Sequence, residues 1–281
     1  MLGPSSIEAM PYLEVEDVRL GYREFGTQHG AKRPVLGIMG FAMDARMWAA
    51  QVPAVTQHRR FVTFDNRGTG RSTGPPITTI ADMATDALAL IDHLETDKAV
   101  LFGLSMGGAV AQQLALDHPE RVEALILGVT WARPIEFMRR QHLLARFVID
   151  NGGPTTLTES SLIRMFTPEF FEVGADMVDQ LVSYVMTQGK PDLPDREVLL
   201  AQLDALDKHD VLDRLGELNV PTLVLGGKMD MMVPGFASQE IAAAIPGAQL
   251  AMFETGHGCM VEEMQPFNDA ISSFLVSLEG S

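Results

Sequence analysis

The chain has 281 residues, of which 46% are hydrophobic and 21% charged, so it can bury a large core and is not expected to be disordered. Acidic residues outnumber basic ones by 37 to 21, and the formal net charge of −16 disfavours nucleic acid and anionic membrane surfaces as partners. The single cysteine, Cys259, excludes an internal disulfide and a cysteine-rich metal site.

The start of the chain shows no targeting pattern. Residues 1–17 contain no basic stretch followed by an apolar run, and no segment reaches the roughly 18 to 20 apolar residues that span a bilayer. Together with the lone cysteine, this leads us to expect a cytoplasmic protein without a membrane partner.

Strands are predicted first by residues 13–26, where polar and apolar residues alternate as in an antiparallel pair joined near Glu16 and Asp17. Short, almost continuous apolar runs follow, rich in β-branched and aromatic residues. Such runs are typical of parallel strands covered on both faces. They occupy residues 34–40, 60–65, 99–105, 123–130, 221–227 and 248–254.

Helical spacing separates most of these runs. It covers residues 44–57, 79–96, 106–118, 235–245 and 262–278. The alternation of strands and helices predicts an α/β fold with a mostly parallel sheet flanked by helices.

The segment 131–218 breaks this alternation, because it contains several helical stretches and no convincing strand. One of its helices is expected to follow a capping box formed by Thr156 and Glu159. We interpret 131–218 as a helical lid inserted into a core domain made of residues 1–130 and 219–281.

The pentapeptide GLSMG places Ser105 between a predicted strand and a predicted helix. A glycine-rich turn without chemistry is the alternative, but this strand–turn–helix context is the one in which Gly-x-Ser-x-Gly carries a nucleophile. Gly103 and Gly107 are expected to leave room where a side chain would collide with a neighbouring strand or helix.

A serine nucleophile needs a base and an acid that orients the base. His257 directly follows the apolar run 248–254, and Asp230 follows 221–227, so both are predicted at the sheet edge where Ser105 lies. His142 and His209, in the segment 131–218, are weaker candidates for the base.

These motifs together resemble the α/β-hydrolase superfamily, in its small lid-bearing branch of bacterial esterases, enol-lactonases and haloperoxidase-like proteins. The resemblance covers nearly the whole chain. It rests on the elbow GLSMGG, the loop FDNRGTGRS (64–72), PTLVLGGKMD with the acid, and ETGHG with the histidine. It implies an α/β-hydrolase fold with Ser105, Asp230 and His257 as catalytic residues.

The resemblance also implies an oxyanion hole made of the backbone N–H groups of Phe41 and Met106. Met39 occupies a position where histidine is common in the family, so the polar network behind this loop must differ. Asp65 and Arg67 are interpreted as a buried structural pair that braces the loop 64–72.

The remaining features point to an apolar pocket. Several methionines lie near the predicted catalytic loops and suit a pocket for apolar acyl or alcohol groups. They are Met39, Met43, Met106, Met229, Met231, Met232 and Met260. Cys259 is expected to be a small packed side chain. No metal-binding spacing, dinucleotide motif or P-loop appears, so no cofactor and no metal are expected.

The sequence therefore predicts a serine hydrolase that cleaves a small-molecule carboxylic ester with an apolar part, through an acyl-enzyme on Ser105. Three alternatives stay open: a lactone or C–C bond hydrolase with the same triad, a cofactor-free haloperoxidase or perhydrolase, and a non-catalytic ligand-binding receptor. Dehalogenases and epoxide hydrolases of this superfamily are disfavoured, because they have aspartate in place of Ser105.

Overall fold

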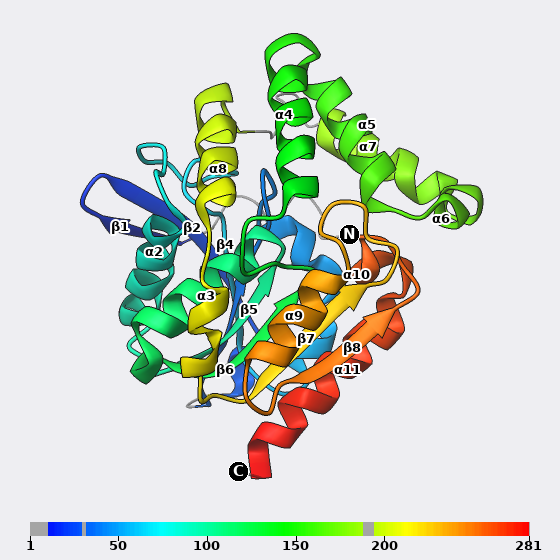
Figure 1. Ribbon diagram of the computed structural model, residues 1–281. Coiled ribbons are helices and arrows are strands. Elements are labelled where there is room, and N and C mark those ends of the chain that lie inside the picture. Colours follow the sequence, from blue (N-terminus) through cyan, green and yellow to red (C-terminus); the bar gives the residue numbers. More distant parts are fainter. Residues whose placement is uncertain (1–10, 30–31, 188–193, 281) are drawn as a thin grey trace.

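An eight-stranded sheet with helices on both faces forms the centre of the molecule (Figure 1). The computed structural model describes residues 11–29, 32–187 and 194–280. The strands are β1 (Tyr12–Val15), β2 (Val18–Phe25), β3 (Val35–Ile38), β4 (Phe61–Phe64), β5 (Ala99–Leu104), β6 (Val122–Gly128), β7 (Thr222–Gly227) and β8 (Gln249–Phe253).

The strand order is β1-β2-β4-β3-β5-β6-β7-β8. From β4 to β8 all neighbours are parallel, whereas β1–β2 and β2–β4 are antiparallel. Strands β3, β4, β5 and β7 are buried at every position, as their continuous apolar runs predict. The predicted α/β fold with a mostly parallel sheet flanked by helices, and the N-terminal hairpin, which turns at Glu16 (φ 52°), are confirmed.

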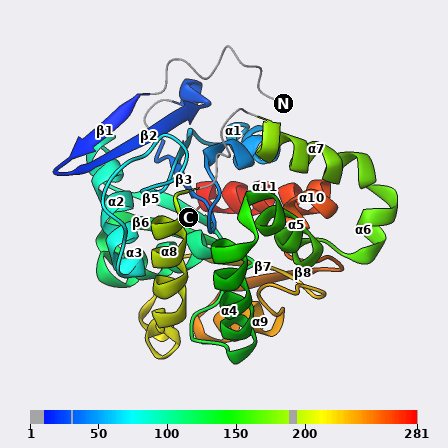
Figure 2. The same ribbon diagram turned by 90° about the horizontal axis from the view of Figure 1, so that it is seen from above.

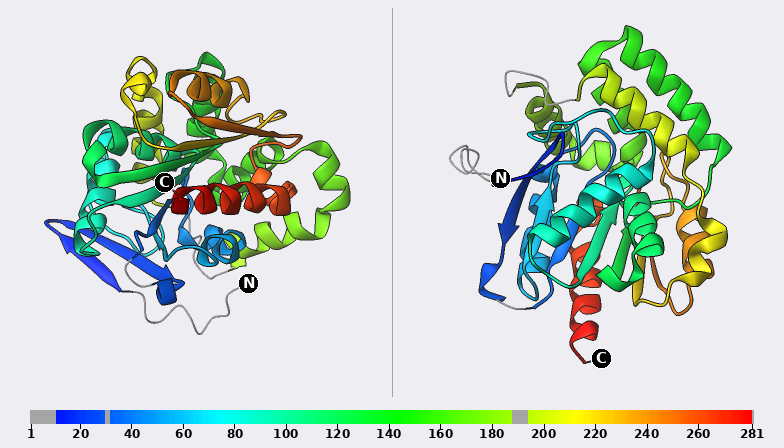
Figure 3. Two further views of the ribbon diagram at one scale, coloured as in Figure 1. Left: turned by 90° about the horizontal axis from the view of Figure 1, so that it is seen from below. Right: turned by 90° about the vertical axis from the view of Figure 1, so that its left-hand side faces the viewer.

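Helices pack on the two faces of the sheet over separate apolar clusters (Figures 2 and 3). Alternate strand residues point to opposite faces: Leu36 joins one cluster and Val35 the other. One face is covered by α2 (Ile80–His93), α3 (Met106–Asp117) and α9 (Phe236–Ala244), and the other by α1 (Val52–Thr56) and α11 (Met264–Ser277).

The connection from β6 to β7 holds a group of helices at the top of the molecule in Figure 1. These are α4 (Glu136–Asn151), α5 (Gly153–Met165), α6 (Pro168–Val173), α7 (Ala175–Thr187) and α8 (Arg196–Lys208). Within 131–218, the residues that the structure describes form no strand.

Several local predictions differ from the structure. Helix α5 begins at Gly153, so the predicted capping box of Thr156 and Glu159 lies inside the helix and is wrong. Pro154 at the first turn favours this earlier start, because proline has no N–H and its φ suits a helix N-terminus. A capping box does open α2, with Thr79 and Asp82.

Two predicted helices are each divided. The range 44–57 contains a 3-10 helix (Ala45–Ala50) and α1. The range 262–278 begins at the last residue of α10 (Cys259–Glu262) and contains α11. The sequence did not predict α6, whose six residues are too few to show helical periodicity.

Candidate active site

Ser105 occupies a sharp turn between β5 and α3. Its backbone angles, φ 53° and ψ −117°, lie in a region that non-glycine residues rarely adopt. A Cβ at Gly103 would collide with the carbonyl oxygen of Gly107, and one at Gly107 with the carbonyl oxygen of Ile38 in β3. Both glycines are therefore required by the close approach of backbones, as the sequence predicts.

His257 and Asp230 form a buried hydrogen-bonded pair. His257 Nδ1 lies 2.7 Å from Asp230 Oδ2. The other carboxylate oxygen, Oδ1, accepts the backbone N–H groups of Met232 (2.7 Å) and Val233 (2.8 Å). Because Oδ1 is held by these two donors, the carboxylate has a fixed orientation and presents Oδ2 to the imidazole.

The loops that carry this pair are brought together by the ends of β7 and β8. The N–H of Met229 donates to the carbonyl oxygen of Thr255 (3.0 Å). A Cβ at Gly227 would collide with the carbonyl oxygen of Gly256, so glycine is needed there for the loops to meet. Glu262 holds the histidine loop from behind by accepting the Gly256 N–H (2.9 Å).

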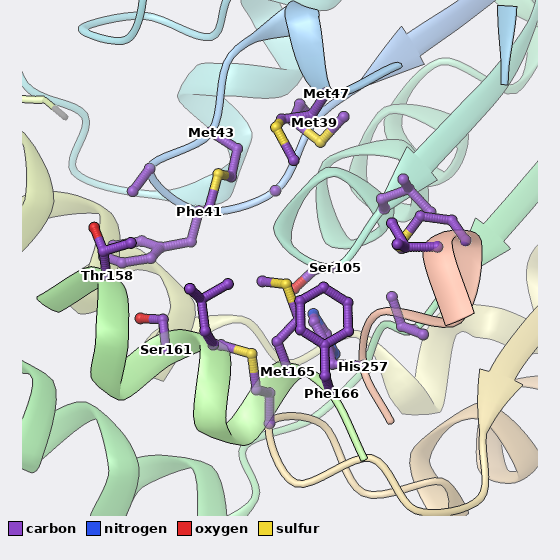
Figure 4. Close-up of a pocket in the computed structure, with 18 of the residues that line it drawn as sticks. Met39, Phe41, Met43, Met47, Ser105, Thr158, Ser161, Met165, Phe166 and His257 are labelled. Carbon is purple, nitrogen blue, oxygen red and sulfur yellow. The ribbon is translucent and has the colours of Figure 1, made fainter. Parts of the chain in front are cut away.

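Ser105 and His257 line one cavity, which Figure 4 shows in close-up. In the part of the chain that the structure describes, the two side chains do not form a hydrogen bond with each other. Catalytic hydrogen bonds are often long before a substrate binds and shorten in the complex. The structure thus brings Asp230 and His257 into direct contact and places Ser105 beside the same cavity.

The two residues predicted to supply an oxyanion hole both belong to segments next to Ser105. Met106 is the first residue of α3, so its N–H has no acceptor within the helix. Phe41 lies in a turn closed by the Met43 N–H and the Gly40 carbonyl oxygen (3.3 Å), and it lines the cavity. A Cβ at Gly40 would be 3.3 Å from the Cβ of Ser105, so this loop passes next to the serine.

Two buried amides that the sequence analysis did not single out hold the loop after β3. Asn66 Nδ2 donates to the carbonyl oxygen of Met39 (2.8 Å), and Gln202 Oε1 in α8 accepts the Ala42 N–H (3.1 Å). Asn66 lies in the FDNRGTGRS motif, which could have drawn attention to it. Gln202 had no local signal, because its partner is 160 positions away in the sequence.

The predicted pairing of Asp65 with Arg67 is wrong. Asp65 accepts the backbone N–H groups of Ala45 (2.8 Å) and Arg71 (2.9 Å). Burial raises the pKa of the Asp65 carboxyl to about 6, and the Asp44 carboxylate adds to the rise. Arg67 instead binds both oxygens of Asp86 in α2, at 2.9 and 2.6 Å, because this buried carboxylate matches the planar fork of a guanidinium.

The cavity has a volume of about 140 Å³ and a largely apolar lining (Figure 4). Its methionines are Met39, Met43, Met47, Met165, Met232 and Met260. Of the other methionines predicted nearby, Met106 is buried in the core, while Met229 and Met231 are exposed. Flexible, polarizable side chains of this kind suit an apolar ligand of variable shape.

The other candidate groups have contacts of their own and form no hydrogen bond with Ser105 among the described residues. Cys259 is buried, as predicted for a small packed side chain, and this burial raises the pKa of its thiol. His142 pairs with Asp207, and His209 is buried against Trp131. Among the described residues, no group of three or more His, Cys, Asp or Glu side chains is arranged to hold a metal ion.

The helices of the described residues differ from membrane-spanning helices. None of them combines the length and the apolar character that a membrane span needs.

A family model described as alpha/beta hydrolase fold matches residues 33–263, so the chain belongs to the α/β-hydrolase family. A Caulobacter vibrioides protein named "Putative carbamate hydrolase RutD" is 33% identical over 262 residues, which are 91% of this chain and 95% of that protein. The 3-oxoadipate enol-lactonase 2 of Acinetobacter baylyi is 33% identical over 267 residues, with coverages of 94% and 95%.

A solved structure supports the same family assignment. The crystal structure of an enol-lactonase from Burkholderia xenovorans superposes with a TM-score of 0.85 at 29% identity, covering 95% of this chain and 100% of that one. The resemblance predicted from the motifs is therefore confirmed over almost the whole chain, and the relatives carry the names of hydrolytic enzymes.

Proposed function

We propose that this chain is a serine hydrolase that cleaves carboxylic esters of modest size through an acyl-enzyme on Ser105. The observation that supports the proposal most is the Asp230–His257 hydrogen bond (2.7 Å), formed by a histidine that lines the same cavity as Ser105. The strained backbone of Ser105 adds support, since such strain at an exposed turn is a feature of nucleophile elbows.

In the proposed reaction, Ser105 Oγ attacks the ester carbonyl while His257 Nε2 accepts the serine proton. Asp230 binds Nδ1–H, which keeps Nε2 free as the base and stabilises the imidazolium that forms. His257 then protonates the departing alcohol, and it later activates the water that hydrolyses the acyl-enzyme.

The negative charge on the carbonyl oxygen would be bound by the N–H groups of Phe41 and Met106. Such preorganised donors contribute roughly 3 kcal/mol each to acyl transfer. The positive end of helix α3 adds to the stabilisation, because Met106 is its first residue.

The helices between β6 and β7 are proposed to act as a lid. Their segment, 131–218, would then cover a core domain made of 1–130 and 219–281. Support comes from α5, which contributes Leu157 and Leu162 to the wall of the cavity that Ser105 and His257 also line. A lid of this kind excludes water and sets the size of the substrate.

The experiment compares wild type with Ser105→Ala on p-nitrophenyl esters of increasing acyl length. Wild type is expected to hydrolyse the short esters, and the variant is expected to lose this activity while keeping its fold by circular dichroism. Full activity of the variant would exclude Ser105 as the nucleophile.

Lactone hydrolysis is the second candidate, supported by the two relatives named enol-lactonase. The same attack on a carbonyl also applies to carbamates, which the name of a third relative contains. Turnover of matched esters, lactones and carbamates of equal carbon number would rank the three classes by kcat/KM.

A further inference from the structure

A second, smaller chamber adjoins the apolar cavity at the proposed nucleophile. It has a volume of about 60 Å³, and Phe41, Ser105 and Met232 line both spaces. The chamber differs from the apolar cavity in its lining, because α4 and α5 contribute the polar side chains of Gln141, His142 and Arg164.

The Arg164 guanidinium has only neutral partners. Its Nε donates to the carbonyl oxygen of Ser160 (2.7 Å) and its Nη1 to Gln141 Oε1 (3.2 Å). Across the described ranges of the chain, no Asp or Glu forms an ion pair with Arg164. Burial lowers the pKa of Arg164, but an arginine remains charged at neutral pH.

The acidic partner of His142, Asp207, is already bound by two side chains. Asp207 accepts His142 Nδ1 (2.6 Å) and Arg146 Nη2 (3.3 Å). Burial lowers the pKa of His142, which favours its neutral ring, whereas Arg164 carries a permanent positive charge into the chamber. A partly buried cation without a counterion is unfavourable unless an anion from outside completes the pair.

The guanidinium is also held in place. Gln141, which accepts from Arg164, is itself fixed by a bond from its Nε2 to the carbonyl oxygen of Met232 (3.1 Å). Met232 belongs to the loop that follows Asp230, so the cation is tied to the catalytic loops. An arginine with a fixed fork is well suited to bind a carboxylate through two parallel hydrogen bonds.

We propose that this chamber is a carboxylate subsite, and that the preferred substrate is a monoester of a short dicarboxylic acid. Arg164 would bind the free carboxylate while Ser105 attacks the ester carbonyl, and the uncharged remainder would occupy the methionine-lined cavity. This inference rests on the proposed function. Because the net charge of −16 disfavours anionic substrates in general, binding of a carboxylate here would depend on the local positive charge of Arg164.

The first test uses two esters of equal length, monoethyl glutarate and ethyl pentanoate, with hydrolysis followed in a pH-stat. Wild type is expected to show a kcat/KM at least about tenfold higher for monoethyl glutarate. A factor of this size is the effect expected of one charge-assisted hydrogen bond. Equal values, or a preference for ethyl pentanoate, would overturn the carboxylate subsite but leave the proposed ester hydrolysis intact.

Variants then locate the subsite. In Arg164→Gln the ratio of the two kcat/KM values should fall to about one, whereas Arg164→Lys, which keeps the charge, should retain part of the preference. Arg140→Gln is the matched control, because Arg140 is exposed on α4 and pairs with Glu136 outside the chamber. An unchanged ratio in Arg164→Gln would contradict the assignment.

Binding gives a readout that does not depend on turnover. Glutarate should bind wild type more tightly than butyrate by at least about tenfold in calorimetry, and Arg164→Lys should bind it more weakly. Glutarate binding without hydrolysis of either ester would refute the proposed function while supporting the subsite. If glutarate and butyrate bind equally, the subsite is refuted even where Arg164→Gln fails to fold.

Discussion

The Oε1 atom of Gln202 accepts a hydrogen bond from the backbone N–H of Ala42 over 3.1 Å. This bond joins α8, in the segment 131–218, to the loop that carries Phe41. Ala42 has a φ of 60°, a conformation that costs free energy for a residue with a Cβ and therefore needs support from its surroundings. The fully buried Gln202 supplies that support.

Gln202→Met is expected to lower kcat about tenfold with little change in KM, because the Phe41 N–H would lose its fixed direction in the transition state. Steady-state kinetics on a short p-nitrophenyl ester measure this split. Gln239→Met, at an exposed position of α9, is the matched control. Equal kcat values in wild type and Gln202→Met would show that the bond has no role in positioning the loop.

Asp230→Asn should remove activity without unfolding the protein. The amide oxygen can still accept the N–H groups of Met232 and Val233, but the amide NH₂ would face His257 Nδ1 and favour the wrong tautomer. We expect kcat to fall by roughly 10³ to 10⁴. The exposed Asp269→Asn provides the control, and a loss smaller than about tenfold would argue against Asp230 as the orienting acid.

The buried His209 is expected to make the stability of the protein depend on pH. Burial lowers its pKa from 6.5 to about 4, so between these values the unfolded chain binds a proton that the folded chain does not. The stabilisation is therefore complete above pH 6.5 and is lost as the pH falls towards 4, with a maximum of about 3 kcal/mol. The free energy of unfolding, measured with urea from pH 4 to 7, should depend less on pH in His209→Gln than in wild type.

Two checks accompany this measurement. Asp65 acts in the opposite direction, because its raised pKa of about 6 makes its contribution fall as the pH rises, so only the difference between the two proteins isolates His209. His118→Gln, at a histidine whose side chain is 44% exposed, controls for the loss of an imidazole. Parallel curves for wild type and His209→Gln would contradict the predicted effect.

Much of the fold and the site could be predicted because the relevant signals are local. Continuous apolar runs identified the buried strands, and residues placed directly after strands, such as Asp230 and His257, meet at one edge of a parallel sheet. The glycines around Ser105 were predictable for the same reason, since a sharp strand-to-helix turn leaves no space for a Cβ.

The interactions that the sequence did not predict join distant segments. Arg67 pairs with Asp86 on α2, and Gln202 on α8 binds Ala42, which lies 160 positions earlier in the chain. Neither pairing has a signal in spacing or composition, because it depends on how the helices pack on the sheet. The early start of α5 was missed for a different reason: a proline in the first turn competes with a nearby capping-box pattern.

The central claim is that Ser105 is the nucleophile, and covalent labelling tests it most directly. After reaction with a fluorophosphonate, intact-protein mass spectrometry should show one adduct per chain, and peptide mapping should place it on Ser105. Ser161→Ala removes another hydroxyl that lines the cavity and should still be labelled, whereas Ser105→Ala should not. An adduct on any other residue, or equal labelling of Ser105→Ala and wild type, would contradict the account.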